Sequence, residues 1–270
     1  MIKFIATDLD GTLVNSEGKI YNKVFNLIND LHKNGVKFAA ASGRFYSQLN
    51  ENFNSVKEDM ILIAHNGALI KYSKNGQTLY ANYIDKEYIK SVEKLKRNFG
   101  EELILAGENE AFVVNPSQSI KEEFSFYNVP YIEYKSFDEV DKPVQKISYY
   151  VKDGIKAPMI DYLKENLNKN LQFVASGDKW IDMMNKEVSK GHAIKILQKK
   201  FNIEKDNTMV FGDYYNDITM FKQAYYSYAM ENAPEDVKEK ANFIAGNNNE
   251  NAVYKTISKH MGFISYRKLF

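Results

Sequence analysis

Two aspartates with a single residue between them, Asp8 and Asp10, follow a short apolar run near the start of the sequence. The run over residues 4–6 predicts a buried strand, and Gly11 after the second acid predicts a turn. In an α/β sheet, ligands bind outside the carboxyl ends of the strands, where the N–H groups of the next turn are also free. Two carboxylates and free N–H groups at such a point suit a metal ion and a phosphate group.

These two acids can divide the work of phosphoryl transfer. One carboxylate can attack phosphorus and become an aspartyl-phosphate, while the second protonates the departing oxygen and later activates water. We assign attack to Asp8 and proton transfer to Asp10. An isolated pair of this kind is more often an ordinary turn, so the assignment depends on the rest of the chain.

Ser42 follows a second apolar run, residues 36–41, and a helix is predicted between the two runs over residues 22–33. A strand, a helix and a strand in this order place the two strands parallel, so Ser42 is expected at the same sheet edge as Asp8. Its hydroxyl and a neighbouring N–H can bind a phosphate oxygen. Gly43 and Arg44 follow directly and are candidate pocket residues.

A third apolar run, residues 60–64, ends at His65 and Asn66. We expect Asn66 to line the pocket. His65 is expected to be a structural histidine and not a metal ligand. Two short runs around residues 69–72 and 78–82 then predict a hairpin.

Two later segments also carry polar groups. Lys190 lies at the start of a predicted helix that ends at Phe201. A cation is unfavourable at a helix N-terminus unless an anion lies nearby, so a phosphate could bind both the lysine and the helix N-terminus. A solvated surface lysine is the alternative. The run over residues 208–212 ends at Asp213, Asn216 and Asp217. Hard oxygen ligands in this number suit Mg²⁺, although Asn216 or Asp217 could simply cap the next helix.

Between residues 84 and 185 the pattern changes to helices interspersed with paired strands, which indicates an antiparallel α+β unit. Helices are predicted over residues 86–99, 117–127 and 157–167, and strands over 102–106, 111–115, 144–151, 171–176 and 180–184. We therefore expect a core formed by residues 1–83 and 186–270, with residues 84–185 inserted as a second domain. This domain shows no catalytic constellation, and its expected role is a lid that excludes water and selects the leaving group.

Composition narrows the class of protein. The 270 residues are 44% hydrophobic and 26% charged, as in soluble globular proteins, and the net charge of +1 gives no electrostatic case for nucleic-acid binding. The absence of cysteine excludes disulfides and thiolate metal sites. The two early aspartates interrupt any signal peptide, and no apolar run is long enough to span a membrane. We expect a cytoplasmic protein that acts on a small phosphorylated molecule, with no obligate protein partner.

The four motifs in this order resemble the pattern of the haloacid dehalogenase (HAD) superfamily, specifically its Cof-type (subclass IIB) phosphatases. The motifs are Asp8-x-Asp10-Gly-Thr12, Ser42-Gly43-Arg44, Lys190, and Gly212-Asp213-x-x-Asn216-Asp217. The segments Asn66-Gly67-Ala68 and Asn232-Ala233 also look like that subgroup, so the resemblance spans nearly the whole chain. It implies an α/β fold: a Rossmann-like parallel-sheet HAD core with an inserted α+β (type C2B) cap domain.

The resemblance also implies a role for each motif residue. Asp8 would be the nucleophile and Asp10 the general acid and base. The implied Mg²⁺ ligands are the carboxylates of Asp8 and Asp213 and the main-chain carbonyl of Asp10, with Asp217 as a further ligand or close neighbour. The implied phosphate-binding residues are Thr12, Ser42, Lys190 and Asn216.

The expected activity is Mg²⁺-dependent hydrolysis of small phosphorylated metabolites through an aspartyl-phosphate. Sugar phosphates, or a phosphorylated cofactor such as pyridoxal phosphate, are the expected substrates. Two alternatives stay open at this point. One is a phosphosugar mutase of the same superfamily, and the other is a catalytically idle regulatory or binding relative.

Overall fold

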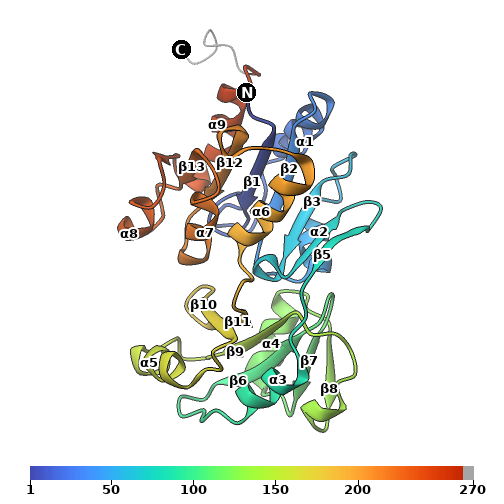
Figure 1. Ribbon diagram of the computed structural model, residues 1–270, viewed down its shortest axis with the longest axis vertical. Coiled ribbons are helices and arrows are strands. Elements are labelled where there is room, and N and C mark those ends of the chain that lie inside the picture. Colours follow the sequence, from blue (N-terminus) through green and yellow to red (C-terminus); the bar gives the residue numbers. More distant parts are fainter. Residues whose placement is uncertain (264–270) are drawn as a thin grey trace.

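The computed structural model describes residues 1–263, and these form two β-sheets, one above the other in Figure 1. The eight-stranded sheet has the order β14-β13-β12-β1-β2-β3-β4-β5 and is built from the two ends of the chain. The six-stranded sheet has the order β10-β11-β9-β6-β7-β8 and comes from the middle of the chain. The fold is therefore the expected α/β core with an inserted α+β cap.

The core sheet is parallel from β14 to β3 and continues into the antiparallel hairpin of β4 and β5. Its strands are β1 (Phe4–Asp8), β2 (Lys37–Ala41), β3 (Ile61–Ala64), β4 (Leu69–Tyr72), β5 (Thr78–Ala81), β12 (Thr208–Gly212), β13 (Tyr226–Ala229) and β14 (Phe243–Ile244). Its helices are α1 (Lys23–Lys33), α2 (Tyr46–Asn52), α6 (Lys190–Phe201), α7 (Ile218–Phe221), α8 (Glu235–Lys238) and α9 (Ala252–His260).

Strand β1 lies at the centre of this sheet and all five of its residues are buried. Ile5 packs with α1 and α9 on one face, whereas Phe4 and Ala6 pack with α6 and α7 on the other. Burial on both faces explains why the strand reads as a continuous apolar run instead of an alternating one. The strand therefore holds Asp8, its last residue, in a fixed place.

The cap sheet is antiparallel except for the pairing of β7 with β8, which is parallel. Its strands are β6 (Glu102–Ala106), β7 (Ala111–Val114), β8 (Tyr131–Tyr134), β9 (Lys146–Tyr150), β10 (Leu171–Ala175) and β11 (Trp180–Asn185), and its helices are α3 (Lys86–Glu93), α4 (Gln118–Phe126) and α5 (Ala157–Asn166). Helices α3 and α5 pack in one hydrophobic cluster and α4 in another.

One predicted helix was too long, and two elements were not predicted. The helix predicted over residues 86–99 ends at Glu93, because the N–H groups that would continue it bind side chains: that of Lys96 donates to the Tyr162 hydroxyl and that of Phe99 to the Glu101 carboxylate. Helix α2 and strand β8 were not predicted.

Two segments connect the core and the cap, and they are joined to each other at Asn185. The side-chain amide of Asn185 donates to the Asn82 side-chain oxygen at 2.7 Å and to the Tyr83 carbonyl at 2.9 Å. The outgoing and returning segments therefore run side by side. Within residues 1–263, no helix has the length and apolar character needed to cross a membrane.

His65 lies where the core meets the cap and is fully buried. Its ring packs edge-on against Phe45 with the centroids 5.1 Å apart, and Nε2 lies 3.4 Å from the Glu108 carbonyl oxygen of the cap. Burial, reinforced by the nearby charge of Lys146, lowers the pKa of His65 to about 3. The contacts fit a neutral structural histidine.

We predict that the His65→Asn substitution weakens the acid sensitivity of the fold. The imidazole pKa falls from 6.5 in the unfolded chain to about 3 in the folded protein, so the folded state binds fewer protons and stability is lost as the pH falls through this window. Between about pH 7 and about pH 5 the wild type should lose about 2 kcal/mol more than the variant. Asparagine tolerates the positive φ at this position, and equal losses in urea unfolding would contradict the prediction.

Candidate active site

The carboxyl ends of β1, β2 and β12 meet at one edge of the core sheet, as expected for neighbouring parallel strands. Asp8 ends β1, Ser42 follows β2 directly, and Asp213 follows β12 directly. Lys190, the first residue of α6, reaches the same point, since its Nζ lies 2.5 Å from Asp8 Oδ1. Four stretches that are remote along the chain thus supply one site.

Lys190 is 1% exposed and forms a buried ion triad with two aspartates. Its Nζ donates to Asp8 Oδ1 at 2.5 Å and to Asp217 Oδ1 at 2.7 Å. Burial alone would lower the pKa of Lys190, but the carboxylates of Asp217 and Asp8 outweigh it and raise that pKa above its usual value. The ammonium at the start of α6 is therefore neutralised by carboxylates and is not a solvated surface charge.

Asp217 is fully buried and holds the loop after β12 in place. Its Oδ2 accepts the N–H groups of Asp213 and Tyr214 at 3.0 and 3.1 Å, while Oδ1 accepts Lys190. Gly212 makes this approach feasible, because a Cβ there would overlap the Asp217 side chain. Both oxygens of Asp217 are thus engaged by the protein itself.

The turn after β1 positions Asp213 from the other side. Thr12, which is 1% exposed, donates its hydroxyl to Asp213 Oδ1 at 2.7 Å. Gly11 has a φ of +79°, and a Cβ at this residue would overlap the Asp213 carboxylate. The two residues after Asp10 therefore set the orientation of Asp213.

Asp8, Asp213 and Asp217 each present a carboxylate oxygen within 4.8 Å of the others. With all three carboxylates ionised, the one ammonium of Lys190 would leave a formal charge of −2 at this point. Burial raises the pKa of Asp8 well above its usual value, opposed by Lys190 and reinforced by the neighbouring acids. The pKa of Asp213 rises to about 6, chiefly through burial and then through Asp217.

This donor set fits a divalent metal ion. Hard carboxylate oxygens with uncompensated negative charge are the ligands that Mg²⁺ prefers. The side chain of Asp10 lies outside the cluster of three and is 55% exposed.

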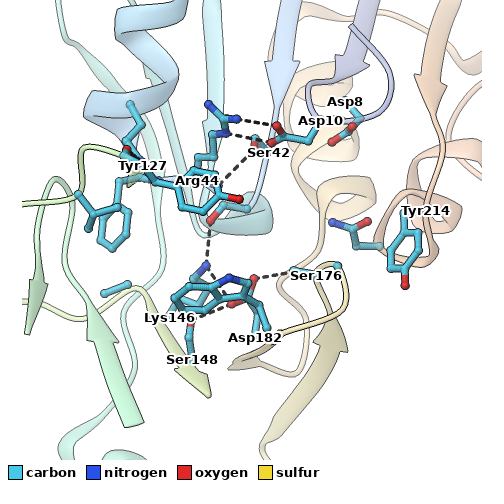
Figure 2. A pocket seen from close by; sticks show the side chains of 18 of the residues that line it. Asp8, Asp10, Ser42, Arg44, Tyr127, Lys146, Ser148, Ser176, Asp182 and Tyr214 are labelled. Carbon is cyan, nitrogen blue, oxygen red and sulfur yellow. Dashed lines mark hydrogen bonds and ion pairs between the residues drawn. The ribbon is translucent and has the colours of Figure 1, made fainter. Parts of the chain in front are cut away.

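Asp10 is bound instead by Arg44 in a bidentate pair, visible at the top of Figure 2. Nη2 of Arg44 lies 2.5 Å from Asp10 Oδ1 and Nε lies 2.9 Å from Oδ2. The Arg44 N–H donates to the Ser42 hydroxyl at 3.2 Å. Arg44 therefore joins the second motif to the first.

A cavity of about 390 Å³ extends from these residues to the cap. The predicted site residues that line it are Asp8, Asp10, Ser42, Gly43, Arg44, Lys190, Asp213, Asn216 and Asp217. Thr12 and Asn66, in contrast, are not among the residues that line it. Asn66 is buried and donates to Asp182 Oδ2 at 2.8 Å, and its own oxygen accepts the Asn216 amide at 3.1 Å.

A polar cluster in the cap, which was not predicted, faces this cavity. Lys146 Nζ lies 2.9 Å from Asp182 Oδ1 and donates to the Gly43 carbonyl of the core at 2.8 Å (Figure 2). Ser148 and Ser176 donate to the same Asp182 carboxylate at 2.7 and 2.8 Å. A lysine and an aspartate in two apolar strands could have indicated a buried ion pair, because buried charges need partners. The register that pairs the two strands could not be predicted from the sequence.

The comparisons with known proteins agree with this geometry. A family described as haloacid dehalogenase-like hydrolases matches residues 5–257. The Escherichia coli 5-amino-6-(5-phospho-D-ribitylamino)uracil phosphatase YbjI is 29% identical over 264 residues, which cover 96% of each chain. The solved structure of SMU.1108c from Streptococcus mutans superposes with a TM-score of 0.87 at 32% identity, covering 97% of this chain and 100% of that one. The HAD subclass IIB sugar phosphatase BT4131 superposes with a TM-score of 0.79 at 26% identity, covering 97% and 100% of the two chains.

The chain belongs to the haloacid dehalogenase-like hydrolase family, and within it to the Cof-type group. It is an enzyme, a HAD-type phosphatase.

We predict that Asp182→Asn destabilises the protein by about 3 kcal/mol in urea unfolding, because it leaves the Lys146 ammonium buried without its counter-charge. The double variant Lys146→Met with Asp182→Asn should lose less than the sum of the two single variants, because the two side chains share one interaction. As a control, Asp161→Asn breaks the exposed cap pair with Lys164 and should leave stability nearly unchanged. Additive losses in the double variant would contradict the coupling.

Proposed function

We propose that this chain is a Mg²⁺-dependent phosphatase that hydrolyses small phosphorylated metabolites through an aspartyl-phosphate intermediate. The observation that carries the proposal is the buried triad of Lys190, Asp8 and Asp217 beside Asp213. The names of two relatives support the substrate size, since one acts on a phosphorylated ribitylaminouracil and another on sugar phosphates. We further propose residues 1–83 and 186–270 as the catalytic core and residues 84–185 as the cap; residues 264–270 lie outside the described part of the chain.

In the first step, a carboxylate oxygen of Asp8 attacks phosphorus, and the bond from phosphorus to the leaving oxygen breaks. Asp10 gives its proton to that oxygen. Both oxygens of Asp10 are engaged by Arg44 in this structure, so the transfer requires Asp10 to turn away from the guanidinium. The buried charge of Lys190 and the Ser42 hydroxyl hold the transferred phosphoryl group.

In the second step, water attacks phosphorus of the aspartyl-phosphate while Asp10 takes its proton. The bond between phosphorus and Asp8 breaks, which regenerates the carboxylate and releases inorganic phosphate. The carboxylates of Asp8 and Asp213 and the main-chain carbonyl of Asp10 would hold Mg²⁺, with Asp217 close by. When bound, Mg²⁺ offsets the repulsion between the anionic nucleophile and the anionic substrate.

We predict that Asp8→Asn lowers turnover of p-nitrophenyl phosphate by about a thousandfold or more, because an amide cannot form the phosphorylated intermediate. The fold should survive, because the change removes a charge that burial already disfavours. Phosphate release and circular dichroism check the two statements, with Asp161→Asn as an active control. Retained activity in a folded Asp8→Asn variant refutes the assignment of the nucleophile.

We predict that MgCl₂ raises the melting temperature of the wild type by a few degrees and does so much less for Asp213→Asn. A ligand that binds only the folded state stabilises it by about 2.7 kcal/mol at a hundredfold excess over Kd. The substitution removes one proposed ligand and also relieves a buried repulsion, so the variant itself should fold. The same Mg²⁺ shift in both proteins would exclude Asp213 as a ligand.

A further inference from the structure

Much of the cavity wall beyond the phosphoryl site is apolar. We name this apolar wall by its six residues: Phe45, Ile104, Phe124, Tyr127, Val129 and Trp180. Most of them belong to one hydrophobic cluster, which the cap builds around α4 and which Phe45 of the core completes. The wall therefore lies where the leaving group of a phosphate ester bound at Asp8 would extend.

Most of the charged groups that the cap presents to the cavity already bind other groups of the protein. Asp182 Oδ1 accepts a hydrogen bond from Ser148 and forms an ion pair with Lys146. Its Oδ2 accepts hydrogen bonds from Asn66 and Ser176. The other cap carboxylate on the cavity, Glu123, accepts the Tyr150 hydroxyl and the Lys179 ammonium on one oxygen, Oε1, both at 3.2 Å. A leaving group rich in hydroxyls would compete with most of these contacts for the same oxygens, whereas an apolar ring would not.

Two aromatic rings of the apolar wall, those of Trp180 and Tyr127, keep part of their surface exposed. Trp180 is partly buried, and Tyr127 is 44% exposed, whereas Phe45 and Phe124 are almost fully buried and support them. The Trp180 indole is held by the Tyr150 ring, with the centroids 5.0 Å apart. Flat rings pack well against such fixed aromatic side chains, in offset or edge-to-face contact.

We propose that this enzyme selects phosphate monoesters whose leaving group carries an aromatic or heteroaromatic ring, and that Trp180 is the side chain that determines this choice. The inference rests on the proposed phosphatase function and adds the class of leaving group. The phosphate binds at Asp8 and Lys190, and the ring packs on the apolar wall.

The test compares 2-phenylethyl phosphate with glucose 6-phosphate. Both are esters of primary alcohols, so the acidity of the leaving group does not favour the aromatic compound. The wild type should show a kcat/KM at least about tenfold higher for 2-phenylethyl phosphate, because its ring loses contact with water on the wall. Trp180→Ala should lower that value by about tenfold and change the value for glucose 6-phosphate by less than about twofold.

Two variants serve as controls. Trp180→Phe should keep most of the preference, because it retains an aromatic ring. Tyr225→Ala removes a half-exposed ring on the core, outside the cavity, and should change neither ester. The proposal is overturned if the wild type hydrolyses glucose 6-phosphate as well as the aromatic ester, or if Trp180→Ala lowers both values equally.

A binding measurement separates this inference from the proposed function. Trp180 is the single tryptophan of the chain, so the intrinsic fluorescence of Asp8→Asn reports directly on the wall. Titration with 2-phenylethyl phosphate should shift the emission at concentrations where glucose 6-phosphate does not. Turnover of p-nitrophenyl phosphate tests the proposed function by itself. If the wild type hydrolyses neither ester, the titration still decides: tighter binding of the aromatic ester supports the wall, and equal or weaker binding overturns it.

Discussion

The charge of the Lys190 ammonium stabilises the buried carboxylates on which the site depends. Taking a carboxylate out of water costs several kcal/mol, and Asp8 and Asp217 are both buried beside a third acid. Lys190 offsets part of this cost with two short contacts. The position of α6 against the sheet therefore matters for chemistry as well as for packing, since it delivers this one charge.

The rest of the site depends on how closely the backbone approaches the acids. Gly11 and Gly212 leave no room for a side chain, so the turns after β1 and β12 can close on Asp213 and Asp217. Thr12 then fixes Asp213 with its hydroxyl. Crowded acids raise each other's pKa and lower stability at neutral pH. This cost is typical of a functional site in which a bound cation neutralises the crowded acids.

The cap and the core are coupled through polar groups as well as through packing. Asp182 of the cap accepts the Asn66 amide, and the oxygen of Asn66 accepts Asn216 from the loop beside Asp213. Lys146 adds a bond to the Gly43 carbonyl next to Ser42. The placement of the cap is thus linked, through single hydrogen bonds, to both loops that surround the reacting group.

Sequence reasoning placed the parts of the site that follow from sheet rules. Asp8, Ser42 and Asp213 lie at the ends of parallel strands, so their common edge was predictable. The pattern around Lys190 fitted a solvated surface lysine as well, and the resemblance to the family is what assigned it to the site. The partners of individual side chains were not predictable. The hydrogen bond from Thr12 to Asp213 and the ion pair of Arg44 with Asp10 depend on rotamers and turn geometry. The pair of Lys146 with Asp182 depends on the register of two cap strands that are far apart in the sequence.

The bonds from Asn185 to the opposite connecting segment have a mechanical consequence. Two connections tied to each other would have to bend together and would resist twisting past one another. Any opening of the cap would then be a swing about a single axis, with the indole of Trp180 following an arc over the nucleophile. The gap available to an incoming ester would be set by one angle.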